Sequence, residues 1–126
     1  MSKRTRVLVV DDEERFGRMV KVNLEMTGRY EVKIETQGKC CVATARVFTP
    51  DLILLDIVMP DMAGSEVVQA LHKDPELKLK PLIFLTALSQ EEASFHLEKT
   101  PDAFVLTKPI ASQDLAAWID RKTKGD

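Results

Sequence analysis

Residues 51–56 read Asp51-Leu52-Ile53-Leu54-Leu55-Asp56, a run of four large apolar residues between two carboxylates. A strand with one wet face alternates apolar and polar residues, whereas a strand covered on both faces is apolar throughout. This run therefore predicts an inner strand of a sheet that is covered by helices on both faces.

Strand-like and helix-like segments alternate five times around this run. The predicted strands cover residues 7–10, 30–35, 51–56, 82–85 and 104–106. The predicted helices cover residues 13–26, 39–48 and 64–72, a segment from Ser89 to near Thr100-Pro101, and a last segment with Leu115, Trp118 and Ile119 inside. This order predicts an α/β fold, a doubly wound parallel sheet with right-handed crossovers.

Bulk properties exclude several classes of protein. A chain of 126 residues fits one domain, residues 1–126, and 44% hydrophobic residues can build a core. The net charge of -2 gives no field that attracts nucleic acid or an anionic membrane. The apolar runs are too short to cross a bilayer, and no signal peptide is recognisable. Cys40 and Cys41 are adjacent, which disfavours a disulfide. We expect a cytoplasmic protein with reduced thiols.

Polar residues follow four of the five predicted strands. Asp11 and Asp12 come after the first strand, Asp56 ends the third, Thr86 follows the fourth and Lys108 follows the fifth. The carboxyl ends of parallel strands meet at one edge of a sheet, where open α/β sheets bind their ligands. Taken singly, each residue is more simply a cap or a turn. Their shared position predicts one site.

The residue types at this edge suit phosphoryl transfer. Three converging carboxylates repel one another, and Mg²⁺ relieves this because it takes oxygen ligands and needs few carboxylates. An aspartate can act as a nucleophile and form an aspartyl-phosphate. Lys108 offers a point charge for phosphoryl oxygens, and Thr86 offers a hydroxyl donor. These groups meet the main needs of phosphoryl transfer, which are positioning and charge neutralisation.

Four blocks of the sequence resemble the signature of the response regulator receiver family, in the same order. The blocks are Val9–Glu13, Leu55–Gly64, Leu85–Ala87 and Thr107–Pro109. The resemblance covers essentially the whole chain. It implies a flavodoxin-like (βα)5 fold with strand order 2-1-3-4-5. The alternating strand 30–35 would then lie at an edge, in agreement with its period of two.

The resemblance also implies the chemistry. Asp56 would accept a phosphoryl group from a sensor histidine kinase or a histidine phosphotransfer protein. Mg²⁺ would be held by Asp12, Asp56 and the backbone carbonyl of Val58, with Asp11 acting partly through water. The domain would catalyse only its own phosphorylation and dephosphorylation, and otherwise would not be an enzyme.

The remaining implied roles concern the switch. Thr86 would move toward the phosphoryl group, Lys108 would pair with one of its oxygens, and the Lys108-Pro109 bond is often cis in such proteins. The change from an inactive to an active conformation would be read by a downstream output domain or protein, without direct binding of nucleic acid or membrane by this domain.

Three positions depart from the family pattern. Val105 stands where many receivers carry an aromatic switch residue, and the adjacent Phe104 should point to the opposite face of the sheet. Val58 and Leu88 flank the expected path of the attacking water, and neither can orient water by hydrogen bonds. This predicts a long-lived phosphoryl form.

Two other functions compete with this interpretation. One is a Mg²⁺-dependent phosphohydrolase like those of the haloacid dehalogenase family, but its Asp-x-Asp-x-Thr motif would lie on the first strand, where this chain has Asp11-Asp12-Glu13. The other is a receiver-like module that binds proteins without phosphorylation. The complete acidic, hydroxyl and lysine set argues against that module, whereas Val105 favours it.

Overall fold

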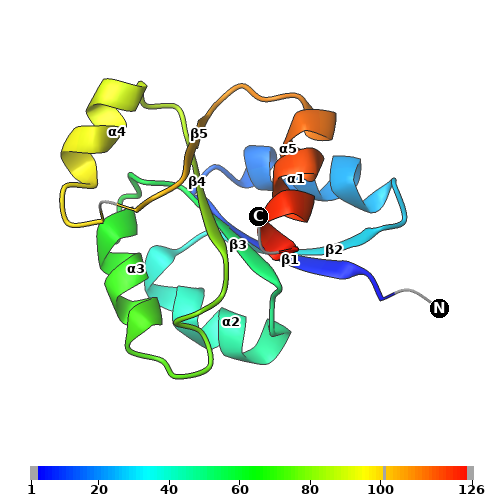
Figure 1. Ribbon diagram of the computed structural model, residues 1–126, viewed down its shortest axis with the longest axis horizontal. Coiled ribbons are helices and arrows are strands. Elements are labelled where there is room, and N and C mark those ends of the chain that lie inside the picture. Colours follow the sequence, from blue (N-terminus) through cyan, green and yellow to red (C-terminus); the bar gives the residue numbers. More distant parts are fainter. Residues whose placement is uncertain (1–2, 101, 125–126) are drawn as a thin grey trace.

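The computed structural model describes residues 3–100 and 102–124, and its centre is a parallel five-stranded sheet (Figure 1). The strand order is β2-β1-β3-β4-β5. The strands are β1 (Thr5–Val10), β2 (Tyr30–Glu35), β3 (Leu52–Leu55), β4 (Leu82–Thr86) and β5 (Val105–Thr107). The flavodoxin-like order and the edge position predicted for residues 30–35 are both confirmed.

Helices cover both faces of this sheet. They are α1 (Glu14–Glu25), η1 (Gly38–Cys40, a 3₁₀ turn), α2 (Cys41–Phe48), α3 (Gly64–His72), α4 (Gln90–His96) and α5 (Ser112–Thr123). In Figure 1, α1 and α5 lie together on one side of the sheet, and α2 and α3 lie on the other. Within the described ranges, no helix is both long enough and apolar enough to span a membrane.

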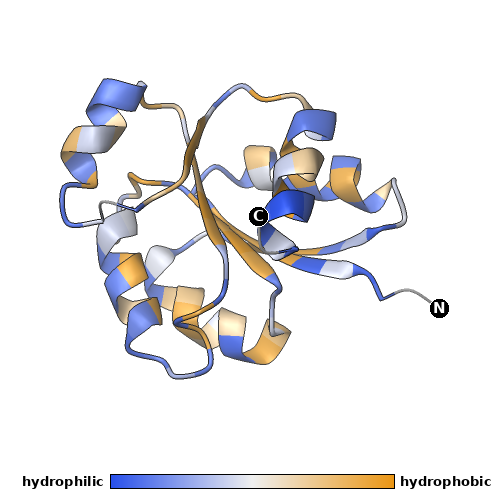
Figure 2. Cartoon of the chain, in the orientation of Figure 1, coloured by the Kyte–Doolittle hydropathy of each residue, from blue (hydrophilic) through white to orange (hydrophobic). Residues whose placement is uncertain are grey.

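The apolar run in β3 joins the two hydrophobic cores. Ile53 and Leu55 belong to the core beneath α2, α3 and α4, whereas Leu52 and Leu54 belong to the core beneath α1 and α5. All four side chains are buried. Figure 2 shows apolar residues along the central strands and mixed polarity on the helices. The prediction of a strand covered on both faces is confirmed.

Several predicted element bounds differ from the structure by a few residues, among them those of α4 and β5. Helix α4 ends at His96, and Leu97 already has φ -110 and ψ 26, outside the α region. The helix was predicted to continue to near Thr100-Pro101, of which Pro101 lies outside the described residues. Strand β5 starts at Val105, one residue later than predicted.

The inner face of α1 also differs from the prediction. Met19 was grouped with the apolar stripe of this helix but is 51% exposed. Gly17 is buried instead, and a Cβ there would lie 2.9 Å from Cγ2 of Ile34. The helix therefore packs closely on β2 through Gly17, Val20 and Leu24, which turns Met19 outward.

Gly64 fixes the approach of α3 to the end of β3. Its N–H donates to the Ile57 carbonyl at 2.7 Å. A Cβ at this position would lie 2.7 Å from the Asp56 carbonyl oxygen and 2.9 Å from the Ile57 Cα. Both contacts are with backbone, so a side chain here requires α3 or the strand end to move.

We predict that Gly64→Ala destabilises the protein by about 1–3 kcal/mol, the usual cost of overpacking. Chemical denaturation at neutral pH measures this change. Gly17→Ala is the comparison, because its closest contact, 2.9 Å to Cγ2 of Ile34, is with a side-chain atom rather than with backbone, and alanine gains about 1 kcal/mol of helix propensity over glycine. Equal stability of Gly64→Ala and wild type would contradict the packing argument.

Candidate functional site

Three carboxylates meet at the carboxyl edge of the sheet. Asp11, Asp12 and Asp56 each place an oxygen within 4.8 Å of the others. The sheet ladder continues into this edge, because the Asp11 N–H donates to Glu35 at 3.0 Å and the Asp56 N–H donates to Val10 at 3.0 Å. Asp11 and Asp56 are buried, while Asp12 is exposed. The structure thus brings together the predicted acidic residues.

Lys108 enters this cluster from the loop after β5. Its Nζ donates to Asp11 Oδ2 at 2.7 Å and to Glu13 Oε1 at 3.1 Å. The same Nζ lies 3.8 Å from Asp56 Oδ2 and 4.0 Å from the centre of the Phe16 ring. One ammonium therefore serves several carboxylates while resting on an aromatic face, which favours a cation.

The two oxygens of Asp56 have different surroundings. Oδ1 accepts a hydrogen bond from the Ile57 N–H at 2.7 Å, whereas Oδ2 faces Lys108. Burial and the nearby Asp11 carboxylate raise the pKa of Asp56, although Lys108, the Thr86 hydroxyl and the Ile57 N–H act in the opposite direction. The cluster therefore opposes full ionisation of Asp56.

The balance at Lys108 favours its charged form. Burial by itself would lower the pKa of this ammonium, but its hydrogen bond to Asp11 and the charges of Asp11 and Asp56 outweigh burial and raise the pKa. Lys108 is therefore a fixed positive charge at neutral pH, while the carboxylates around it outnumber it.

Thr86 connects the site to the loop after β4. It is 1% exposed, and its Oγ1 accepts a hydrogen bond from the Leu88 N–H at 3.3 Å. Its carbonyl accepts the Lys108 N–H at 2.7 Å, and the Lys108-Pro109 bond is cis. Leu88 packs against the core beneath α4. A displacement of Thr86 would therefore reach the start of α4.

Phe104 and Val105 lie on opposite faces of the sheet, as predicted. Val105 packs in the core beneath α4, and Phe104 packs in the opposite core against Trp118, with ring centres 4.7 Å apart. Val58 is 48% exposed beside the acidic edge. No aromatic side chain therefore occupies the switch position.

Sequence reasoning missed Glu13 and Phe16 as members of the site. Glu13 directly follows the aspartate pair, and Phe16 lies about one helical turn further along. Both contact Lys108, which is more than 90 residues away in the chain, so the sequence pattern gave no sign of these contacts. The acidic set itself suits a hard divalent ion, because carboxylate oxygens are its preferred ligands and burial and crowding raise the pKa of Asp56. The residues present fit Mg²⁺.

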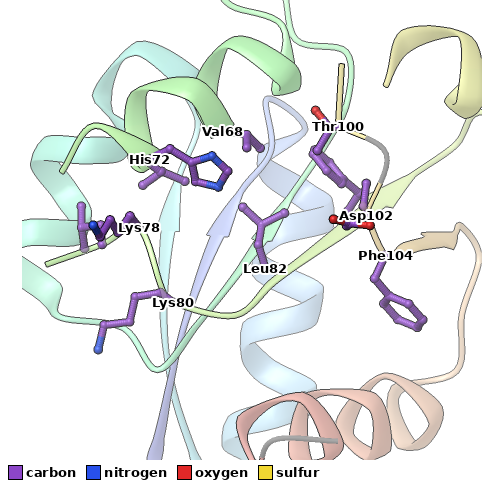
Figure 3. A pocket seen from close by; sticks show the side chains of 12 residues that line it. Val68, His72, Lys78, Lys80, Leu82, Thr100, Asp102 and Phe104 are labelled. Carbon is purple, nitrogen blue, oxygen red and sulfur yellow. The ribbon is translucent and has the colours of Figure 1, made fainter. Parts of the chain in front are cut away.

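A separate cavity of about 160 Å³ opens at the other end of β4 (Figure 3). It lies between the C-terminal part of α3 and the segment before β5, and His72 and Leu82 face each other in it. It shares no lining residue with the acidic edge, and neither it nor the exposed His96 adds a group to the site.

Comparisons with known proteins agree with this geometry. Residues 7–120 match the family described as "Response regulator receiver domain". Protein PilH of Pseudomonas aeruginosa is 33% identical over 95% of this chain and 98% of PilH. The "DNA-binding dual master transcriptional regulator RpaA" of Synechocystis is 34% identical over 90% of this chain, which spans only 47% of RpaA. The Vibrio cholerae chemotaxis protein CheY4 is similar in structure, with a TM-score of 0.84 and 29% identity over 95% of this chain and 99% of that chain.

We predict that Asp56→Asn stabilises the metal-free protein at neutral pH. The raised pKa of Asp56 means that folding favours its protonated form, so its ionisation above that pKa weakens the folded state. The gain should shrink as the pH falls through the raised pKa of Asp56 toward the ordinary aspartate value of 3.8, where the carboxyl is protonated in both the folded and the unfolded state. Chemical denaturation in a chelating buffer, from neutral pH down to about pH 4, measures it.

Asp51→Asn is the control for this measurement. Asp51 precedes β3, at the opposite edge of the sheet, and accepts the Arg6 N–H. Removing its charge should give no comparable gain. A loss of stability in Asp56→Asn at neutral pH would show that attraction to Lys108 outweighs the crowding.

Proposed function

This chain belongs to the response regulator receiver family, and from that membership we propose that Asp56 is its phosphoacceptor in a two-component or phosphorelay system. The observation that carries this proposal is the position of Asp56. Its Oδ2 faces the Lys108 ammonium at 3.8 Å, beside the carboxylates of Asp11 and Asp12. A nucleophilic oxygen and a group that can neutralise phosphoryl oxygens therefore share one edge.

The two Asp56 oxygens divide the work. Oδ1 is held by the Ile57 N–H, so Oδ2 is the free nucleophile. Oδ2 attacks phosphorus, its bond to phosphorus forms, and the bond from phosphorus to the donor's imidazole nitrogen breaks. The hydrogen bond to Oδ1 keeps the carboxylate from turning during the attack, which is a positioning effect.

Receivers of this family bind a divalent metal at the acidic pocket. We propose that Asp12, Asp56 and the Val58 carbonyl hold Mg²⁺ here, and that Asp11 acts partly through water. When bound, the ion neutralises carboxylate and phosphoryl charge. Asp11 and Asp56 are buried, and their backbone N–H groups bond to neighbouring strands, so the sheet edge fixes their positions. Asp12 is exposed to solvent, from which the ion would enter.

Lys108 and Thr86 would respond to the new charge. The Lys108 ammonium, now bonded to Asp11 and Glu13, would turn toward a phosphoryl oxygen. The Thr86 hydroxyl would donate to another oxygen and draw with it the Leu88 backbone that it now contacts. This would shift the domain from an inactive to an active conformation. Because Val105 stands at the position of the aromatic switch residue, this conformational change would not include the rotation of an aromatic side chain.

Several further expectations remain proposals. The phosphodonor would be a sensor histidine kinase or a histidine phosphotransfer protein, and an output domain or separate protein would read the switch. The domain would catalyse only its own phosphorylation and dephosphorylation. A cytoplasmic location agrees with the free thiols of Cys40 and Cys41. The single-domain assignment of residues 1–126 stays a prediction.

We predict a labile adduct of one phosphate after incubation with acetyl phosphate and Mg²⁺, observed by intact-mass spectrometry. The adduct should be absent in Asp56→Asn and when a chelator removes Mg²⁺. Asp51→Asn is the matched control and should be phosphorylated like the wild type, because Asp51 lies at the opposite edge of the sheet.

An adduct that persists in Asp56→Asn would move the acceptor to another residue. If the wild type gave no adduct under any condition, a module that binds proteins without phosphorylation would become the better description.

We further predict that the phosphoryl form is long-lived, and that Val58→Asn shortens its half-life several-fold. An amide at this half-exposed position can orient the attacking water, which valine cannot. The decay of the adduct after removal of acetyl phosphate measures both lifetimes. Val22→Asn, which changes an exposed valine on α1, is the control. A wild-type adduct that decays within seconds, unaffected by Val58→Asn, would contradict this prediction.

A further inference from the structure

We infer that Asp61 is a positioning residue for metal binding, because it anchors the loop that carries the Val58 carbonyl to the start of η1. The inference rests on the proposed function, in which that carbonyl is a ligand. Asp61 contacts none of the three clustered carboxylates in the structure, so its effect would pass through the loop.

The anchor consists of two hydrogen bonds from one carboxylate. Asp61 Oδ1 accepts the Gly38 N–H at 3.2 Å, and Oδ2 accepts the Lys39 N–H at 2.9 Å. The 3₁₀ turn η1 has no side-chain cap of its own from Gln37. Asp61, which lies 23 positions after Gly38, therefore satisfies the first N–H groups of η1. This joins the loop after β3 to the loop after β2.

Close packing strengthens this join. A Cβ at Gly38 would lie 3.0 Å from Met59 Cε, 3.1 Å from Val67 Cγ2 and 3.2 Å from Met62 Cβ. Gly38 and Met59 are buried, although Asp61 itself is exposed. The absence of a side chain at Gly38 lets the loop after β3 lie directly on η1, close enough for both N–H groups to reach Asp61.

The segment between Asp56 and α3 is thus held at both ends and near its middle. At its start, the Ile57 N–H bonds to the Asp56 side chain. At its end, the Gly64 N–H bonds to the Ile57 carbonyl. Val58 lies between these anchors and has an exposed side chain, so core packing of that side chain does not fix its backbone. Asp61 and the buried Met59 supply the missing restraint.

A residue that does not touch the metal can still change its affinity by holding a directly bound ligand in position. Removing such a residue typically lowers metal affinity by about 10–100-fold. Without Asp61, the Val58 carbonyl should sample more positions, and ordering it on binding should cost conformational entropy. The backbone N–H groups of Gly38 and Lys39 should also become free to exchange.

The test is a Mg²⁺ titration of wild type, Asp61→Asn and Asp61→Ala, followed by amide NMR. We expect Asp61→Ala to weaken Mg²⁺ binding by about tenfold. The Mg²⁺ affinity of Asp61→Asn should lie between those of the wild type and Asp61→Ala, since an amide keeps one acceptor oxygen. In both variants the Gly38 and Lys39 amides should exchange faster. Asp51→Ala is the matched control, because it also removes an exposed carboxylate that accepts a backbone N–H.

The outcomes separate the two levels of the proposal. If Asp61→Ala speeds amide exchange at Gly38 and Lys39 but binds Mg²⁺ like the wild type, Asp61 is only a structural cap and the inference is overturned. Equal weakening in Asp51→Ala would overturn it as well. A wild type that binds no Mg²⁺ would instead remove the proposed metal site, and this inference with it.

Discussion

The crowding of three carboxylates around one ammonium is the interaction on which the function of this fold depends. Asp11, Asp12 and Asp56 lie within 4.8 Å of one another, and Lys108 provides the nearby positive charge. Two of these carboxylates are buried at the end of the sheet, where repulsion is poorly screened. Burial of β3 on both faces fixes the strand end that carries Asp56. In our proposal, the same edge of the sheet binds Mg²⁺ and the phosphoryl group.

Lys108 links the resting site to the proposed signalling step. It bonds to Asp11 and Glu13 and rests on Phe16, so a phosphoryl group would compete with existing partners for it. Glu13 is exposed, which makes it the partner that solvent can most easily replace. Thr86 accepts the Leu88 N–H, so a displacement of Thr86 in the proposed step would first reach the start of α4. Asp61 accepts the N–H groups of Gly38 and Lys39 at η1 and does not take part in this exchange in our proposal.

The sequence predicted those features that depend on local pattern. The apolar run of β3 and the alternation in β2 were sufficient to place an inner strand and an edge strand. The polar residues at strand ends were predicted to meet because parallel strands share a carboxyl edge, and Asp11, Asp12, Asp56 and Lys108 do meet.

Features that depend on distances between elements were not predicted. Met19 fits a helical stripe but lies outside, because close packing through Gly17 rotates α1 against Ile34. The contacts of Glu13 and Phe16 with Lys108, and of Asp61 with Gly38, join segments far apart in the chain. Helix α4 is also shorter than its pattern suggested.

The most direct test of the proposed site is a crystal structure of the protein grown with Mg²⁺ and beryllium fluoride, which mimics a phosphoryl group. We predict beryllium bonded to Asp56 Oδ2, Mg²⁺ on Asp12, Asp56 and the Val58 carbonyl, and Lys108 turned from Glu13 toward a fluoride. Beryllium fluoride absent from Asp56, or Mg²⁺ bound elsewhere, would contradict the proposed site.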